Sequence, residues 1–277
     1  MTYRMHLSRH RGDDGARWAL DGALLPETVT LATLLSLPHD FRQSLLACPP
    51  AGEAVAGATP LAPVDAAHEV WASGVTYLRS RDARRAESQD ADVYERVYAA
   101  ERPEIFFKAP GWRVGGPGAP IRVRRDSRWS VPEPELVLVL DHEARIVGYT
   151  AGNDVSSRDI EGENPLYLPQ AKMYDGSCAL GPAIHLVEDA SELRRVAIAM
   201  TIERDGQAVF EDETNTERLK RAPEELAAWL YREISFPHGA LLMTGTGLVP
   251  PEDFTLRAGD RVTVRVGELE LVNDVGT

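Results

Sequence analysis

The sequence predicts an α+β fold in which strands dominate, with a small N-terminal domain over residues 1–66 and a larger domain over residues 67–277. Three observations support this. From Ile105 onward, most apolar segments have the length and the period of strands. The regular strand–helix alternation of a doubly wound parallel sheet is absent. Residues 49–67 are rich in proline, alanine and glycine, which is typical of a linker or surface loop between two parts.

Composition and charge limit the kind of protein and its partners. Hydrophobic residues make up 43% and charged residues 26%, as in a globular protein, and no apolar run approaches the roughly 18 residues of a membrane span. The first residues lack the apolar core of a secretory signal, so we expect a cytoplasmic protein without a membrane partner. A net charge of −13 repels phosphate backbones, so nucleic acid is not an expected partner. The spacing of Cys48 and Cys178 matches no zinc or redox motif.

Helices are expected in three places. In the N-terminal part, one lies within residues 28–38 and a second follows Asp40, a suitable N-cap. A helical pair is expected over residues 80–100, where apolar residues with helical spacing alternate with many charges. This pair is either an exposed helical excursion or a lid over an active site. One further helix is expected over residues 224–234.

The remaining expected elements are strands. Residues 196–210 contain Asp205-Gly206 between two alternating segments, which predicts a hairpin. The other expected strands cover residues 69–77, 104–108, 120–124, 135–141, 145–150, 240–249, 260–266 and 269–275.

Two glutamates at the start of one strand carry the main chemical signal. Positions i and i+2 of a strand project from the same face, so Glu133 and Glu135 would stand side by side. The LVLVL run that follows is apolar on both faces and indicates a buried strand. Two carboxylates at its mouth repel unless a proton or a cation lies between them. A hard divalent cation, Mg²⁺ with Mn²⁺ or Ca²⁺ as alternatives, prefers such oxygen ligands.

Asp154 is the third candidate ligand. If the two flanking strands form a hairpin with Leu140 opposite Arg145, Asp154 falls opposite Val131, on the face of Glu133. A loop longer by one residue would turn Asp154 to the other face, so the argument depends on register. Structural salt bridges would also explain a Glu-x-Glu pair with a later aspartate, and the pattern alone does not separate these interpretations.

Lysine is scarce, because only Lys108, Lys172 and Lys220 among 30 basic residues are not arginine. Unlike arginine, a desolvated lysine can lose its proton. Lys172 is therefore a candidate for proton transfer or for anchoring a carboxylate, although an ordinary ion pair would also explain it. Glu104 precedes an apolar strand and is a candidate fourth ligand or general base, or else an exposed loop acid.

Four further side chains are candidates for binding an anionic substrate. The loop over residues 244–247 offers hydroxyls and backbone amides to a carboxylate, and Thr246 is the candidate within it. Arg158 and Arg81 could clamp a carboxylate, although either could be a solvated or structural arginine. Gln170, two residues before Lys172, completes the set.

Several motifs together resemble those of the fumarylacetoacetate hydrolase family. The likeness extends from about Trp71 to Val275, and the motifs occur in the family's order: PEIFFKAP, PEPELVLVLD, GYTAGNDVSSRDIE, QAKMYDGSCALGP and LLMTGTGLVPPEDFTLRAGDRV. The resemblance implies a mixed β-roll, a small 2-oxo acid substrate and a homodimer or homotetramer. It also implies site residues, which are metal ligands at Glu133, Glu135 and Asp154, a lysine at Lys172, and substrate contacts near Arg158 and Thr246.

A closer resemblance narrows the implied reaction. The segments TYLRSRDARRAES, ERPEIFFK and DIEGENPLYLPQAKMYDG are similar to those of the 2-keto-3-deoxy-pentonate dehydratases of pentose breakdown. In that subgroup an acid at the position of Glu104 lies at the metal. The implied enzyme is a Mg²⁺-dependent hydro-lyase that converts 2-dehydro-3-deoxy-D-arabinonate to 2,5-dioxopentanoate. The base is Lys172, if it is neutral, or else Glu104.

Three alternatives stay open on the same residues. A hydrolase of acylpyruvates or a decarboxylase of oxaloacetate would use the same metal site. Family hydrolases, however, carry Gln at the position of Glu161 and a His–Glu pair on a lid, whereas residues 78–100 contain no histidine. The second alternative is a metal-free dehydratase that forms a Schiff base on Lys172. The third is a binding protein without catalytic activity.

Overall fold

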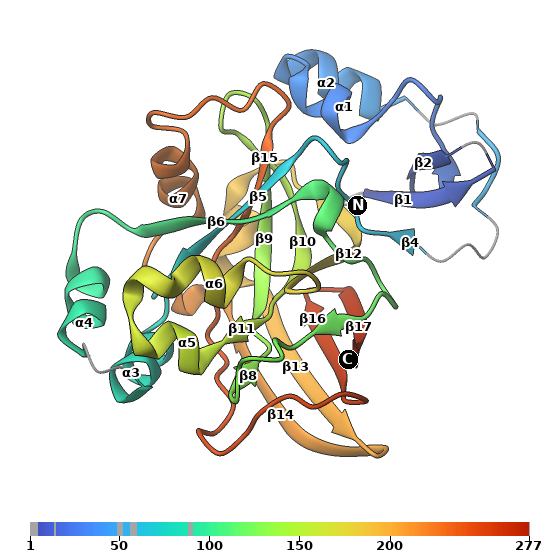
Figure 1. Ribbon diagram of the computed structural model, residues 1–277. Coiled ribbons are helices and arrows are strands. Elements are labelled where there is room, and N and C mark those ends of the chain that lie inside the picture. The colour runs from blue at the N-terminus through green and yellow to red at the C-terminus, as the bar shows by residue number, and fades with distance from the viewer. Residues whose placement is uncertain (1–4, 14, 49–51, 56–59, 88–90, 277) are drawn as a thin grey trace.

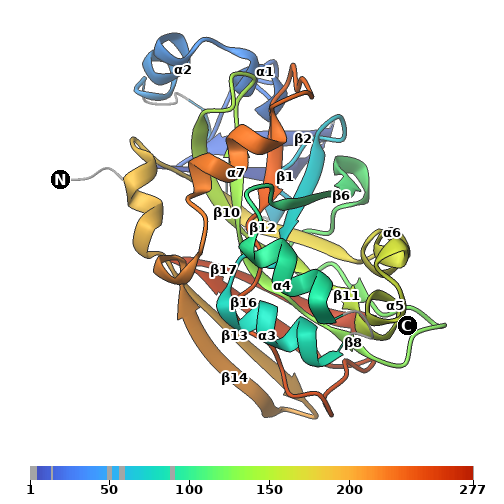
Figure 2. The same ribbon diagram turned by 90° about the vertical axis from the view of Figure 1, so that its left-hand side faces the viewer.

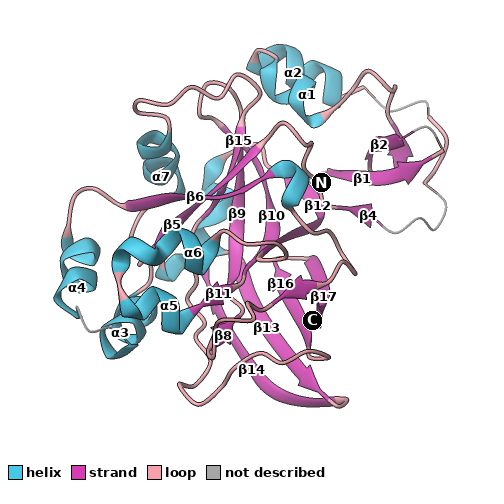
Figure 3. Ribbon diagram, viewed as in Figure 1, coloured by secondary structure: helices cyan, strands magenta, loops and turns pink. Residues whose placement is uncertain are grey.

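The protein is described here by a computed structural model that covers residues 5–13, 15–48, 52–55, 60–87 and 91–276 (Figure 1). Strands form its centre and the helices lie around them (Figure 3). The predicted strand-dominated α+β class is therefore confirmed. Within the described residues, no helix has both the length and the apolar character needed to span a membrane.

A large mixed sheet forms the middle of the molecule, with its strands in the order β3-β2-β1-β12-β10-β9-β15-β5-β6 and with β4 paired to β1. Its strands are β1 (His6–Gly12), β2 (Gly15–Leu20), β3 (Ala23–Leu24), β4 (Pro60–Leu61), β5 (Glu69–Gly74), β6 (Glu104–Pro110), β9 (Pro134–Leu140), β10 (Ile146–Asp154), β12 (Cys178–Leu186) and β15 (Ala240–Met243).

A second sheet and a short strand pair complete the strand layers. The second sheet has the order β14-β13-β16-β17-β7, and β11 pairs with β8. These strands are β7 (Ile121–Arg122), β8 (Ser130–Val131), β11 (Ser156–Ser157), β13 (Ala197–Arg204), β14 (Gln207–Asn215), β16 (Arg261–Val266) and β17 (Leu269–Gly276).

The helices are short. The α-helices are α1 (Leu31–Ser36), α2 (His39–Leu46), α3 (Leu78–Glu87), α4 (Ala91–Ala99), α5 (Arg158–Glu163), α6 (Leu168–Lys172) and α7 (Pro223–Leu230). The 3₁₀ turns are η1 (Gly111–Arg113), η2 (Pro165–Tyr167), η3 (Ala190–Arg195) and η4 (Thr216–Arg218). Figure 2 shows α3 and α4 one above the other in front of the sheets, with α5 and α6 beside them.

Strand β9 is buried on both faces, which explains its continuous apolar run. Leu136, Leu138 and Leu140 belong to the hydrophobic cluster shared with the second sheet. Val137 and Val139 point the other way, into the cluster shared with the N-terminal residues. Burial on both sides favours apolar residues at every position, instead of alternation. The polar side chains of this segment are therefore confined to its ends, with Glu133 and Glu135 at the start of β9.

Most expected elements are present. The helical pair forms α3 and α4, although residues 88–90 between them lie outside the described residues. Asp205 and Gly206 have φ of 52° and 76°, as the type I′ turn of the predicted hairpin requires. Asp40 is not the cap of α2, because the helix begins at His39 after Pro38; Asp40 lies in its first turn, where a carboxylate favours the helix dipole.

The N-terminal strands β1 to β4 and strand β12 were not expected from the sequence. Strand β1 pairs with β12, so the N-terminal residues extend the large sheet and share a hydrophobic cluster with it. The expected boundary at residue 66 falls in the loop before β5, and the division into two domains stays a prediction. Of the expected linker, residues 49–51 and 56–59 lie outside the described residues.

A buried ion pair joins the N-terminal helices to the β9–β10 turn and gives a test of this packing. Arg42 donates to Asp141 at 2.7 Å, and the two side chains are 3% and 0% exposed. Arg42→Met leaves the buried Asp141 carboxylate without its charged partner. We therefore expect the free energy of unfolding, measured by urea denaturation, to fall by about 3–5 kcal/mol. The control is Arg145→Met, whose half-exposed pair with Glu143 should contribute less than about 1 kcal/mol. Equal losses in both variants would contradict the account.

Candidate active site

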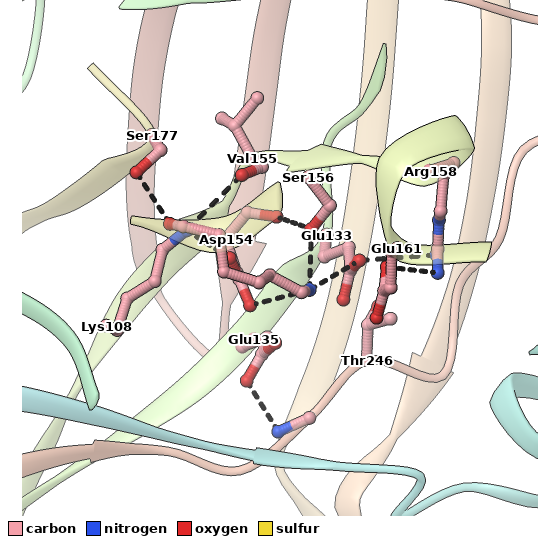
Figure 4. Close-up of polar contacts among 12 residues, drawn as sticks. Lys108, Glu133, Glu135, Asp154, Val155, Ser156, Arg158, Glu161, Ser177 and Thr246 are labelled. Atoms are coloured by element: carbon pink, nitrogen blue, oxygen red, sulfur yellow. Dashed lines mark hydrogen bonds and ion pairs between the residues drawn. The ribbon is translucent and has the colours of Figure 1, made fainter. Parts of the chain in front are cut away.

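Three carboxylates converge where β9 begins and β10 ends. Glu133 immediately precedes β9, Glu135 is its second residue and Asp154 is the last residue of β10. Each offers an oxygen within 4.8 Å of the other two, and their exposed fractions are 4%, 1% and 1%. Figure 4 shows the three side chains directed toward one another. The sequence prediction that these residues lie together is therefore confirmed.

The register that brings Asp154 to this point differs from the expected one. Leu140 pairs with Ile146 rather than Arg145, so the loop is one residue longer than expected. A bulge after Ile146 then shifts the pairing by one more residue, and the Asp154 amide donates to the Glu133 carbonyl at 2.9 Å. Each one-residue shift alone would reverse the face of Asp154, and the two together restore it.

The nearby basic groups do not fully neutralise the carboxylates, which makes the cluster suited to a divalent cation. Burial, followed by the nearby charges of Asp154 and Glu133, raises the pKa of Glu135 well above its ordinary value. The Gly245 amide donates to Glu135 at 2.5 Å and opposes this shift only in part. The adjoining cavity of about 20 Å³ has room for one water-sized group. A buried, all-oxygen donor set of this kind fits Mg²⁺.

Lys172 contacts two of the three carboxylates. It is the last residue of α6, and its Nζ donates to Glu133 at 2.9 Å, to Asp154 at 3.0 Å and to the Ser156 hydroxyl at 2.6 Å. The side chain is buried. The sequence prediction that Lys172 belongs to this cluster is borne out by its position, and its role in catalysis remains a proposal.

Lys108 is a site residue that was not predicted from the sequence. Its Nζ lies 2.5 Å from Asp154 and donates to the backbone carbonyls of Lys172 at 2.5 Å and Val155 at 3.3 Å. The side chain is fully buried. The scarcity of lysine was the available signal, but it did not distinguish Lys108 from a surface residue. Lys108 thus holds the backbone next to Asp154 and at Lys172, and so positions both side chains.

We expect Lys108→Met to reduce turnover by about 100-fold or more, because displacement of reacting groups by about 1 Å has that effect. The measurement is kcat at saturating Mg²⁺, with circular dichroism to verify folding. The matched control is Lys220→Met, which removes a lysine that lies over the Tyr98 ring, outside the cavity. Full activity of the Lys108 variant would contradict the positioning role.

Arg158 and Glu161 form a second charged layer beside Glu133. Both lie on α5, and the Arg158 guanidinium is 3.2 Å from Glu133 and 3.5 Å from Glu161. Arg158 is 2% exposed and Glu161 5% exposed. The guanidinium therefore orients a carboxylate ligand from the side opposite the β10 strand end (Figure 4).

Glu104 and Thr246 line the cavity, as predicted from the sequence. Glu104 pairs with Gly74 across β5 and β6, and a Cβ at Gly74 would lie 2.2 Å from the Glu104 carboxylate. Glycine at this position therefore leaves the space that the carboxylate occupies. The Thr246 hydroxyl is held by the Leu248 backbone, with distances of 3.2 Å to both its amide and its carbonyl.

Arg81 and Gln170 are not brought to the cavity, contrary to expectation. The Arg81 guanidinium donates to Asp82 at 2.6 Å and lies over the Tyr98 ring, so contacts within the helical pair hold it. Gln170 is exposed, because α6 turns Ala171 and Lys172 inward and leaves Gln170 on its outer side. Neither residue contacts the carboxylate cluster in this arrangement.

The charges around the cavity leave a net negative excess. If all are ionised, five carboxylates and three basic groups meet there, and the excess of two negative charges equals the charge of one divalent cation. These groups are Glu104, Glu133, Glu135, Asp154 and Glu161 with Lys108, Lys172 and Arg158. The described residues that line the cavity include no histidine. The arrangement can polarise an anionic substrate and move protons, but it offers no imidazole to activate water.

Comparisons with known proteins agree with this geometry. A family model described as fumarylacetoacetate (FAA) hydrolase C-terminal matches residues 69–276. A probable 2-keto-3-deoxyxylonate dehydratase from Haloferax volcanii is 51% identical over 216 residues, which are 78% of this chain and 74% of the relative. The 2-dehydro-3-deoxy-D-arabinonate dehydratase of Saccharolobus solfataricus is 44% identical over 206 residues, with coverage of 73% and 69%.

Solved structures extend the likeness to the whole chain. A 2-keto-3-deoxy-D-arabinonate dehydratase complexed with magnesium and 2,5-dioxopentanoate superposes with a TM-score of 0.83 at 35% identity, covering 98% of this chain and 99% of that one. Its apo form superposes with a TM-score of 0.84 at 34% identity and the same coverage.

Proposed function

Because this chain belongs to the fumarylacetoacetate hydrolase family, we propose that it is a Mg²⁺-dependent hydro-lyase acting on a 2-keto-3-deoxy sugar acid. The reaction is the conversion of 2-dehydro-3-deoxy-D-arabinonate to 2,5-dioxopentanoate. The observation that carries this proposal is the buried cluster of Glu133, Glu135 and Asp154 in contact with Lys172. Two relatives that are 51% and 44% identical are a probable 2-keto-3-deoxyxylonate dehydratase and a 2-dehydro-3-deoxy-D-arabinonate dehydratase.

Glu133, Glu135 and Asp154 would hold the cation. Bound there, Mg²⁺ polarises the 2-oxo group of the substrate and makes the C3 protons more acidic. Lys108 and Arg158 keep Asp154 and Glu133 in place through the contacts described above. The substrate carboxylate faces the loop of Gly245 and Thr246, whose backbone lies at the cavity.

Glu104 is the proposed base and Lys172 the proposed acid. Lys172 donates to three oxygen atoms at 2.6–3.0 Å, an environment that favours its ammonium form. Glu104 takes a proton from C3, and the Lys172 ammonium gives one to the C4 hydroxyl, which leaves as water. The new C3–C4 double bond then shifts, because C5 loses a proton and C3 regains one. This gives an enol with a C4–C5 double bond, and transfer of its hydroxyl proton to C4 turns C5 into the aldehyde carbon of 2,5-dioxopentanoate.

The direct test is product analysis by NMR. Purified protein with Mg²⁺ is incubated separately with 2-dehydro-3-deoxy-D-arabinonate, an acylpyruvate and oxaloacetate. We expect 2,5-dioxopentanoate from the first substrate and no turnover of the others. Release of a carboxylic acid or CO₂ from the other substrates, without dehydration of the sugar acid, would assign the site to the hydrolase or decarboxylase chemistry instead.

A Schiff base on Lys172 is the alternative for the dehydration itself. It requires a neutral, nucleophilic amine, whereas this amine is enclosed by two carboxylates. We expect no borohydride-trapped adduct in EDTA and no activity there. A labelled Lys172 with activity retained in EDTA would reject the metal-dependent mechanism.

We further propose that the enzyme serves pentose breakdown in the cytoplasm as a homo-oligomer. The dehydratase relatives support the metabolic setting. On α2, Phe41 is 62% exposed and Leu45 39% exposed, which supports a contact between subunits. Light scattering at assay concentration tests the assembly, and a monomer would contradict it.

A further inference from the structure

A second group of metal-ligating side chains lies far from the active site. It consists of His6 on β1, His185 on β12 and Glu268 in the turn between β16 and β17. On β12, His185 lies seven positions after Cys178, which pairs with Asp154, so the two sites are roughly 20 Å apart along the strand. This second group therefore plays no direct part in the proposed dehydration.

The three ligand atoms form a nearly equilateral triangle. His6 Nε2 lies 3.2 Å from Glu268 Oε1, His185 Nδ1 lies 3.1 Å from the same oxygen, and the two ring nitrogens are 3.2 Å apart. Tetrahedral zinc with bonds of about 2.0–2.1 Å places its ligand atoms about 3.3 Å from one another. The observed spacing is thus that of one face of a tetrahedral zinc site.

The backbone fixes each member of the triangle. His6 and His185 are directly opposite in the antiparallel β1–β12 pair. Glu268 follows Gly267 in the hairpin that joins Val266 to Leu269. Gly267 has φ of 59°, and a Cβ there would lie 2.6 Å from the Tyr149 hydroxyl, so the close approach of the turn requires glycine.

The histidines are suited to a cation. The His185 ring stacks on Tyr149 with ring centroids 5.0 Å apart. The ring nitrogens of His6 and His185 lie close to each other and to the same Glu268 oxygen. If both nitrogens carried a proton for that oxygen, the two N–H groups would face each other, whereas a cation can be bound by the lone pairs of all three atoms.

An open position adjoins the triangle. A cavity of about 460 Å³ is lined by His185, Glu268, Glu188, Glu192 and Arg195. Water from this cavity can reach the fourth coordination position. Imidazole ligands with one carboxylate suit Zn²⁺ better than the hard cation that fits the all-carboxylate site.

We propose that His6, His185 and Glu268 form a Zn²⁺ site that ties the N-terminal strand β1 to β12 and to the β16–β17 turn. Its occupancy stabilises the attachment of the N-terminal strands to the large sheet, because the ion binds the folded arrangement and not the unfolded chain.

The test measures zinc binding apart from the active site. Metal-stripped Glu135→Gln protein, whose active-site cluster is disabled, is titrated with Zn²⁺ by calorimetry in excess Mg²⁺. We expect one zinc ion to bind per chain. Adding His185→Gln or Glu268→Gln should lower the zinc affinity by more than the roughly 10–100-fold that follows from changing a residue that only contacts a ligand. His39→Gln, which removes a histidine on α2, is the matched control and should bind as before.

Two further readouts distinguish a site from general destabilisation. Co²⁺ should give the visible absorption of a four-coordinate ion, lost in the His185 variant, and Zn²⁺ should slow hydrogen exchange in β1. In the otherwise native chain, His185→Gln should leave Mg²⁺-dependent turnover unchanged. The proposal is overturned if the Glu135→Gln protein binds no zinc, or if it binds zinc equally well without His185 and without Glu268.

Discussion

Replacing Glu135 by glutamine is expected to lower turnover by roughly 1000-fold or more while making the metal-free protein more stable at neutral pH. The loss of turnover follows because the change removes one of three ligands for a cation that supplies several kcal/mol of transition-state stabilisation. The gain in stability follows because burial and two neighbouring carboxylates raise the pKa of Glu135 in the folded state. Glutamine keeps the shape and removes the charge.

The sign of the pH dependence follows from this shift. The folded pKa of Glu135 lies above the ordinary value of 4.5, so the proton bound by the folded state stabilises it fully below that value. This contribution is lost as pH rises through the raised folded pKa. In EDTA the native protein should therefore lose stability with rising pH, and the Glu135→Gln protein should lose less.

Thermal unfolding in EDTA and in Mg²⁺ at several pH values measures both effects. Mg²⁺ should stabilise the native protein and have little effect on Glu135→Gln. Glu143→Gln is the control, because Glu143 is a half-exposed glutamate outside the cluster. If Glu135→Gln were active, or destabilised in EDTA relative to the native protein at neutral pH, the metal-ligand assignment would be wrong.

Lys172→Met is expected to slow dehydration strongly but to leave proton removal from C3 intact. A general acid contributes roughly 10²–10⁴-fold, and methionine fills a similar volume without a proton to donate. Glu104→Gln should show the opposite pattern. The probe is 2-oxobutanoate, which has C3 protons and no C4 hydroxyl, incubated in D₂O with Mg²⁺ and followed by NMR.

The two variants separate the proposed roles. We expect C3 deuterium exchange with the native protein and with Lys172→Met, and none with Glu104→Gln. Both variants should bind Mg²⁺ in calorimetry, which shows that the ligand cluster is intact. Exchange lost in Lys172→Met and retained in Glu104→Gln would reverse the acid and base assignments.

The carboxylate cluster could be predicted from the sequence because the residues that indicate it are adjacent in the chain. Glu133 and Glu135 both lie at the start of a strand whose continuous apolar run indicates burial, and that conflict between charge and burial requires a cation or a proton. Asp154 was placed on the correct face through two register errors that cancelled. A bulge depends on packing across the sheet, and no local pattern marked it.

Other parts of the site depend on contacts between distant segments. Lys108 reaches Asp154 and the Lys172 carbonyl across 46 and 64 positions of the chain, so the sequence near Lys108 does not indicate these contacts. Arg81 was expected at the substrate, but its neighbour Asp82 holds it within the helical pair. The N-terminal strands were missed because β1 is a strand by virtue of its pairing with β12, which is 166 or more positions away.

Anomalous diffraction from crystals soaked with Mn²⁺ and pyruvate tests the central claim most directly. The account predicts one strong manganese peak coordinated by Glu133, Glu135 and Asp154, with the carboxylate and 2-oxo oxygens of pyruvate as further ligands. A manganese peak elsewhere, or pyruvate bound in this cavity with those three carboxylates turned away from any ion, would contradict it.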